Sequence, residues 1–167
     1  MDYRKFLVAA GIALAAAAPA TAAPITATKD ATGKALILIP LTLTKTSDLD
    51  FGTAVESSTS GTITVPPDGN PPSATGGVTL VGTPGFRAQF AGAGSPGEQV
   101  DIFLAPPASI KDVNGDTMPI SMNLDNNTVI IDSTRAFFVG VGGTVTVAAN
   151  QPDGVYSGNF IVLAQYN

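Results

Sequence analysis

The feature that most constrains this chain is an apolar pattern with a period of two residues. Beyond the first 22 residues the apolar runs are short and are bounded by Gly, Pro, Asn and Asp. That pattern is typical of β-strands joined by tight turns, and no segment shows a helical period. Strands are expected at residues 35–44, 48–55, 61–65, 76–82, 86–91, 98–105, 117–123, 127–132, 135–141, 143–149 and 155–166.

The spacing of these strands indicates a fold class. The chain has 167 residues with 18 Gly and 13 Pro, which favours one domain rich in turns. Regular strands over about 130 residues are typical of an immunoglobulin-like β-sandwich. The sequence therefore predicts an all-β sandwich domain at residues 40–167.

The first 22 residues have the features of a secretory signal peptide. Arg4 and Lys5 precede an apolar run, and Ala20-Thr21-Ala22 provides small residues for a signal peptidase. A bilayer span takes about 20 apolar residues, more than this run contains. We expect an exported protein, in the periplasm and then at the cell surface, with no membrane span in its mature chain.

Composition excludes several classes of function. The chain has no His and no Cys, so the usual general base, thiolate nucleophile, zinc ligands and disulfides are missing. Neither an enzyme nor a cofactor is expected. The net charge is −5, which disfavours nucleic-acid binding because phosphate neutralisation needs clustered Lys and Arg.

One loop offers two interpretations. Asp112-Val113-Asn114-Gly115-Asp116 places two carboxylates and an amide oxygen around a glycine, a set of oxygens that suits Ca²⁺. The same residues are typical of a hairpin turn in which Asn114 and Gly115 take positive φ. We favour the turn.

An N-terminal arm at residues 23–39 precedes the predicted sandwich. Pro40 cannot donate to a ladder, so the first sandwich strand is expected to begin at Leu41. The arm has an alternation of its own, and its residues of one parity are Ile25, Ala27, Gly33, Ala35, Ile37 and Ile39.

The last predicted strand carries an alternating stripe of Tyr156, Phe160, Val162, Ala164 and Tyr166. The simplest interpretation is a half-buried core strand. An arm with no obvious place in the sheet favours instead a sandwich that is one strand short. Such a sandwich exposes the edge of its last strand, and an exposed apolar edge is a template for pairing with another chain.

Three segments carry a resemblance to a known family. They are "PLTLTKTSDLDFGT" from Pro40, "GGVTLVG" from Gly76, and "VGGTVTVAANQPDGVYSGNFIVLAQY" near the C-terminus. Together they resemble the bacterial family catalogued as domain of unknown function 4402. The chain is also similar to the major subunits of archaic chaperone–usher pili and to the spore coat U domain, although the disulfide of many pilins is missing.

The pilin resemblance implies a mode of assembly called donor-strand complementation. In pilins a strand of a periplasmic chaperone pairs with the last strand of the subunit. At the usher, the N-terminal arm of the next subunit later replaces the chaperone strand. By this resemblance the partner-binding residues are Tyr156, Phe160, Val162, Ala164 and Tyr166, lined by Leu41, Leu43, Leu49 and Phe51. The donor residues are the arm residues of one parity named above.

The leading hypothesis is a structural subunit of a bacterial surface fibre, a head-to-tail homopolymer that contributes to adhesion or biofilm. The alternative is a monomeric secreted module that binds a glycan or matrix ligand. The absence of Trp disfavours the glycan interpretation, because it leaves no rich aromatic platform.

Overall fold

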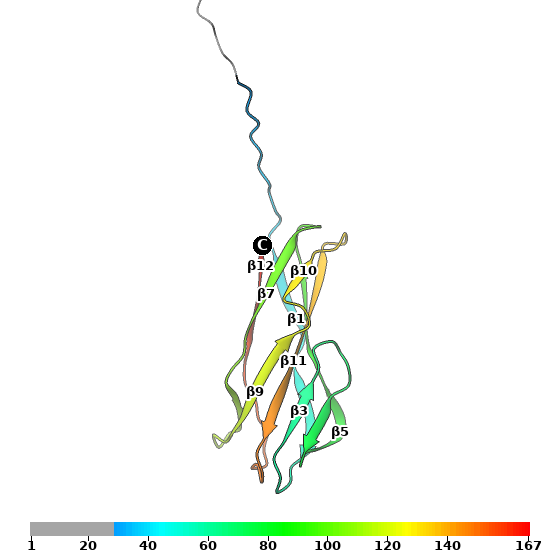
Figure 1. The fold of residues 1–167 in the computed structure, drawn as a ribbon, viewed down its shortest axis with the longest axis vertical. Coiled ribbons are helices and arrows are strands. Elements are labelled where there is room, and N and C mark those ends of the chain that lie inside the picture. Colours follow the sequence, from blue (N-terminus) through cyan, green and yellow to red (C-terminus); the bar gives the residue numbers. More distant parts are fainter. Residues whose placement is uncertain (1–28) are drawn as a thin grey trace, which may run out of the picture. The chain divides into compact units, whose positions relative to one another are not determined.

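The computed structural model describes residues 29–167, and Leu36–Asn167 form one compact unit. The described part contains strands and no helix, so no helix there could cross a membrane (Figure 1). The predicted all-β class is confirmed. The strands are β1 (Thr42–Ser47), β2 (Asp50–Val55), β3 (Gly61–Val65), β4 (Ser73–Gly76), β5 (Thr79–Phe86), β6 (Ala88–Ala93), β7 (Gln99–Ala105), β8 (Ser109–Lys111), β9 (Thr117–Leu124), β10 (Thr128–Ile130), β11 (Ala136–Val147) and β12 (Ile161–Tyr166).

Strand β11 is the centre of the main sheet, and all its pairings are antiparallel. Its first half pairs with β6, and its second half pairs with β3. Val141 and Val145 each also pair with β9, so β6 and β3 share one edge of β11 and β9 takes the other. β1 extends this sheet beyond β6 and β4 extends it beyond β3, while β8 pairs with β9.

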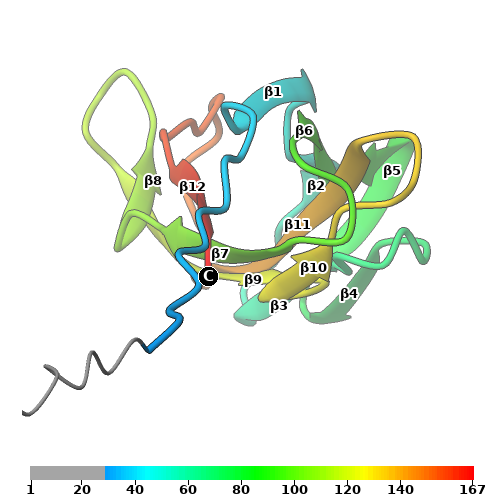
Figure 2. The same cartoon turned by 90° about the horizontal axis from the view of Figure 1, so that it is seen from above.

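Two smaller sheets complete the unit. One has the order β10-β7-β12, and the other pairs β2 with β5. Figure 2 looks down the strands and shows β12 at the end of one sheet and β1 at the end of another. These two strands contact each other without forming a ladder.

The sequence predicted two separate strands at 135–141 and 143–149. This prediction is wrong, because β11 is one strand that runs through both. The prediction left a break at Gly142, but neither Gly142 nor Gly143 has a positive φ. A Cβ on Gly142 would collide with the backbone of Val65 and Pro67. The glycine therefore allows a close approach by the segment after β3 rather than a reversal of the chain.

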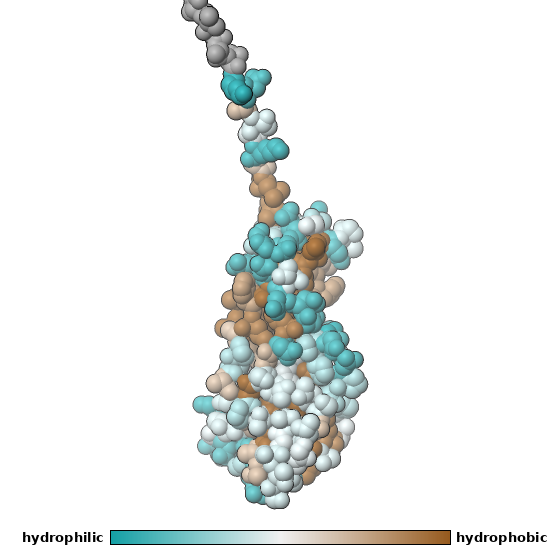
Figure 3. Space-filling view, viewed as in Figure 1, coloured by the Kyte–Doolittle hydropathy of each residue, from teal (hydrophilic) through white to brown (hydrophobic). Residues whose placement is uncertain are grey.

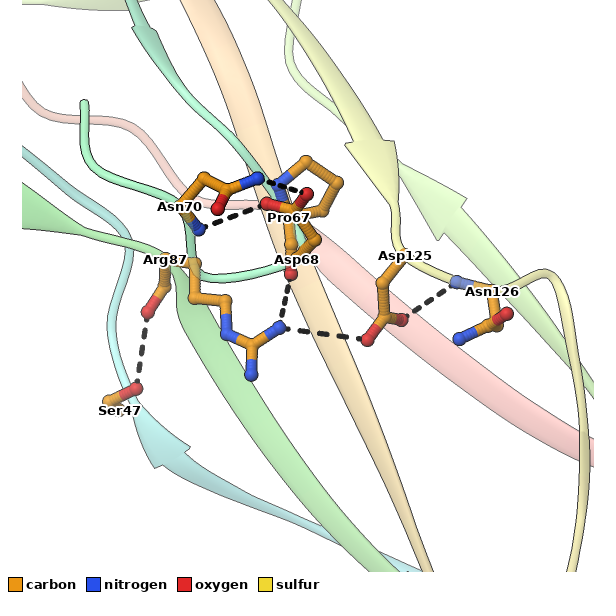
Figure 4. A network of polar contacts seen from close by, with 7 residues as sticks. All are labelled: Ser47, Pro67, Asp68, Asn70, Arg87, Asp125 and Asn126. Carbon is orange, nitrogen blue, oxygen red and sulfur yellow. Dashed lines mark hydrogen bonds and ion pairs between the residues drawn. The ribbon is translucent and has the colours of Figure 1, made fainter. Parts of the chain in front are cut away.

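A polar network holds that segment over the outer face of β11 (Figure 4). Arg87 Nη1 donates a hydrogen bond to the carbonyl of Pro67 and lies 3.8 Å from Asp125 Oδ2. Gly140 lies beneath these groups, where a Cβ would clash with the Pro67 carbonyl. One side chain thus ties together the segment after β3, the start of β6 and the end of β9.

The predicted strand 155–166 is also only partly right. Ser157 makes an isolated bridge to Lys111, whereas regular pairing with β7 begins at Ile161, opposite Ala105. Pro106 and Pro107 end β7 because they cannot donate to a ladder. The final segment therefore changes partner from β8 to β7. Another predicted strand, at 76–82, lies further along the chain, from Thr79 to Phe86.

The core consists of two clusters. The β3 cluster comprises Ile63, Val78, Ile110, Val145 and Val147. The β7 cluster comprises Val100, Ile102, Ile131, Phe137 and Val139. Strand β11 supplies residues to both, because its odd-numbered side chains face inward along its whole length.

Candidate functional site: the facing edges of β1 and β12

The candidate site lies where β1 and β12 contact each other. β1 pairs with β6 along one edge, and β12 pairs with β7 along one edge. Among residues 29–167 neither strand has a ladder partner on its other edge. The backbone N–H and C=O groups on those free edges can accept a further strand.

Five of the predicted site residues converge beneath these edges. They are half-buried side chains that pack against the β7 cluster: Leu41, Leu43, Val162, Ala164 and Tyr166. Leu41 and Leu43 alternate along the start of β1, and the other three alternate along β12. The two strands thus turn apolar side chains toward the same core.

The remaining predicted site residues are not among the side chains that pack directly on the β7 cluster. Phe160 precedes β12 and makes an edge-on contact, with ring centroids 6.2 Å apart, with Phe90, which itself packs on that cluster. Tyr156 and Phe51 pack against the β3 cluster, and Leu49 is half-buried between β1 and β2. Tyr156 donates to the carbonyl of Pro152 over 2.7 Å, which fixes the turn before β12.

Only some of the predicted donor residues lie in the described part of the chain, which begins at residue 29. Ile25 and Ala27 lie outside the described residues, and residues 29–35 form neither helix nor strand. Ile37 is 90 % exposed, Leu36 is 74 % exposed and Ile39 is 39 % exposed. Leu36 and Ile37 are therefore left in solvent by their own chain, whereas Leu38 is half-buried.

Strand β12 is apolar on both faces. Ile161 and Leu163 point outward and are each 59 % exposed, and Phe103 lies opposite Leu163 on β7. Figure 3 shows apolar side chains gathered over the part of the unit where β7 and β12 lie. A strand that is apolar on both faces is typical of one covered on both sides.

Sequence reasoning missed Ser95, which lies in the turn between β6 and β7. Its backbone N–H donates to Tyr166 Oη over 2.8 Å, and its Oγ accepts from the backbone N–H of Ile39 over 2.9 Å. Tyr166 Oη donates in turn to the carbonyl of Ile39 over 2.9 Å. The Gly, Ser and Pro residues around Ser95 are typical of a turn, but nothing in the local sequence indicates this hydrogen-bond partner.

The loop at Asp112 has the geometry of a turn. Asp112 Oδ1 accepts from the backbone N–H groups of Asn114 and Asp116, over 3.0 and 2.7 Å. Gly115 has φ +93°, whereas Asn114 does not take the positive φ that was predicted for it. No group of three or more metal-ligating side chains occurs in the part of the chain that the structure describes.

Comparison with known proteins assigns the chain to a family. The family described as domain of unknown function (DUF4402) matches residues 41–166, from the start of the β1 segment through β12. The chain belongs to this family. No curated protein and no solved structure matches it. The DUF4402 match begins immediately after Pro40, so the arm precedes the matched region.

Proposed function

We propose that this DUF4402 protein is a secreted structural subunit of a bacterial surface fibre, assembled by strand donation into an immunoglobulin-like sandwich. The observation that carries the proposal is the pair of free edges on β1 and β12 above the β7 cluster. A donated strand can pair with these edges and cover the half-buried side chains between them.

The arm has the chemistry of the missing strand. Residues 35–39 read Ala-Leu-Ile-Leu-Ile, so the strand would present aliphatic side chains on both faces. Burying each Ile or Leu is worth about 1.5 to 3 kcal/mol. Because the chain leaves Ile37 in solvent, burial of that side chain in a neighbour supplies free energy that the lone subunit lacks.

Head-to-tail donation gives a polymer. The donor arm and the acceptor edges are different surfaces of one chain, so the contact is heterologous, and heterologous contacts that do not close produce filaments. A periplasmic chaperone would cover the same edges before assembly, and an usher would exchange it for the arm of the next subunit.

Arm deletion tests the proposal. Removing residues 23–39 should give a poorly stable, monomeric protein, and adding this segment as a peptide should restore stability. A peptide with Ile37→Asp should fail, because an unpaired buried carboxylate costs several kcal/mol. The matched control is Leu36→Asp, on the outward parity, which should do much less. An arm-deleted protein as stable and monodisperse as the complete chain contradicts the proposal.

Export is a separate part of the proposal. If the small-residue site at Ala20-Thr21-Ala22 is cut, the exported protein begins at Ala23, or at Pro24 if the peptidase uses Ala23. Mass spectrometry of the exported protein measures this directly. Residues 1–22 still attached would contradict it.

A second candidate function is binding of a glycan as a monomer. An open groove of about 800 Å³ lies between β7 and β9, and Phe103, Asp101 and Asn123 are among its lining residues. An aromatic ring beside a few polar side chains suits a small polar ligand. Titration calorimetry with oligosaccharides, and loss of any binding in Phe103→Ala, tests this candidate.

A further inference from the structure

The hydrogen bonds around Ile39 raise the question of which chain receives the arm. β1 begins at Thr42 and β12 ends at Tyr166, and the Tyr166 hydroxyl binds the carbonyl of Ile39. The arm therefore leaves the domain beside one end of the free edges of β1 and β12. Three residues, 39–41, would be long enough for a hairpin reversal. Chain length alone does not stop the arm from pairing with its own β1.

Local chemistry at Ile39 opposes that reversal. Both backbone groups of Ile39 are engaged, the N–H by Ser95 Oγ and the C=O by Tyr166 Oη. Pro40 restricts the residue before it to extended conformations and offers no donor of its own. A reversal at residues 39–41 would have to break both hydrogen bonds.

Gly94 leaves space for the Tyr166 hydroxyl. A Cβ on Gly94 would lie 2.5 Å from Tyr166 Oη and 3.0 Å from Leu41 Cδ1, so any other residue would push the hydroxyl away. The Ser95 N–H completes the set by donating to the same hydroxyl. The Tyr166 ring packs against the β7 cluster, which holds its position.

We propose that Tyr166 and Ser95 form a clamp on Ile39 that keeps the arm off the free edges of its own chain and so reserves it for a second copy. The clamp rests on the proposed strand donation and adds the choice of partner. It acts before assembly, because it holds the root of the arm whether or not a neighbour is present.

Removal of the hydroxyl tests the clamp in the full exported chain. Tyr166→Phe loses the hydrogen bonds and keeps the ring, and we expect the ratio of self-closed to open subunits to rise about tenfold. In dilute protein, trypsin should then cut more slowly after Lys34, and size-exclusion chromatography with light scattering should show less polymer. Ser95→Ala should act in the same direction with a smaller effect, and it also covers the case in which Tyr166→Phe does not fold.

Tyr156→Phe is the matched control. It also removes a hydroxyl that bonds a backbone carbonyl, but in the turn at Pro152, so trypsin sensitivity and polymer yield should not change. If Tyr166→Phe and Ser95→Ala behave like this control while the wild type polymerises through its arm, the clamp is overturned and strand donation stands. If deletion of the arm leaves polymerisation unchanged, strand donation fails and the clamp fails with it.

Discussion

The two core clusters differ in the pairing of the strands around them. The β3 cluster takes Ile63, Val145 and Val147 from β3 and β11, which have partners on both edges, because β3 runs between β4 and β11, and β11 runs between β3 and β9. The β7 cluster is bordered by β1 and β12, each paired along one edge in the described residues. Under the proposed strand donation, the half around the β3 cluster is finished by its own chain, and the half around the β7 cluster is unfinished until a donor occupies its free edges.

The largest effect should come from emptying the unfinished half. Phe137 is 3 % exposed, and its ring packs against Gly92, where a Cβ would collide with it. Phe137→Ala should lower the free energy of unfolding by about 3 to 5 kcal/mol, because it removes a buried ring and leaves a cavity in the β7 cluster. Urea unfolding measures the change.

Phe138→Ala is the control for that measurement, since Phe138 is the next residue of β11 and is 69 % exposed. Its effect should stay within about 0.5 kcal/mol, as for most surface substitutions. Equal losses in the two variants would mean that the β7 cluster is not a packed core.

A pair of matched truncations compares the two halves directly. Val145→Ala in the β3 cluster should cost about 2 kcal/mol whether or not the arm is supplied, because Val145 is 1 % exposed in the free chain. Val162 packs on the β7 cluster from β12, the strand with a free edge. Val162→Ala should cost about 1 kcal/mol in the arm-deleted protein and about twice that with the arm peptide bound. Melting curves with and without the peptide give both values.

The expected signature is a dependence on the peptide for Val162 and none for Val145. If supplying the arm changes both losses equally, the free edges of β1 and β12 do not make the β7 cluster incomplete.

The sequence predicts features that depend on neighbouring residues better than features that depend on residues far apart along the chain. Alternation predicted the inward side chains of β12, because their period is local. The changes of partner were not predictable in this way. The bridge from Ser157 to Lys111 and the run of β11 through Gly142 both depend on strands far away in the chain.

The candidate site shows the same limit. Leu41, Leu43, Val162, Ala164 and Tyr166 were predicted together, and the structure packs them on one cluster. Tyr156 shares their parity but lies over the β3 cluster, because the chain changes partner before Ile161. Parity along a chain predicts a shared face only while the strand keeps one neighbour.

A smaller effect is expected in the β8–β9 hairpin, which covers the finished half. Asp112→Ala removes the acceptor of the Asn114 and Asp116 N–H groups and should cost about 1 kcal/mol. Asp153→Ala, at an exposed position in another turn, is the control. Because the Asp112 carboxylate is already bonded to backbone, calcium should not raise the melting temperature. A rise of several degrees that Asp112→Ala abolishes would restore the calcium interpretation.

The smallest effect is a response to acid in the turn that leads into β11, on the unfinished half. Asp132 Oδ1 accepts hydrogen bonds from the Thr134 hydroxyl over 2.6 Å and from the Ala136 N–H over 3.0 Å. The Thr134 side chain first, and then the Ala136 N–H, lower the pKa of Asp132 below its ordinary value of 3.8. A carboxyl whose pKa is lower in the folded state stabilises that state above the unfolded pKa, and the contribution is lost as pH falls through the folded pKa. The difference in unfolding free energy between wild type and Asp132→Asn should therefore shrink between about pH 5 and pH 2. Thr134→Val removes the first cause and should reduce this pH dependence, and curves for wild type and Asp132→Asn that stay parallel down to the lowest pH would contradict the assignment.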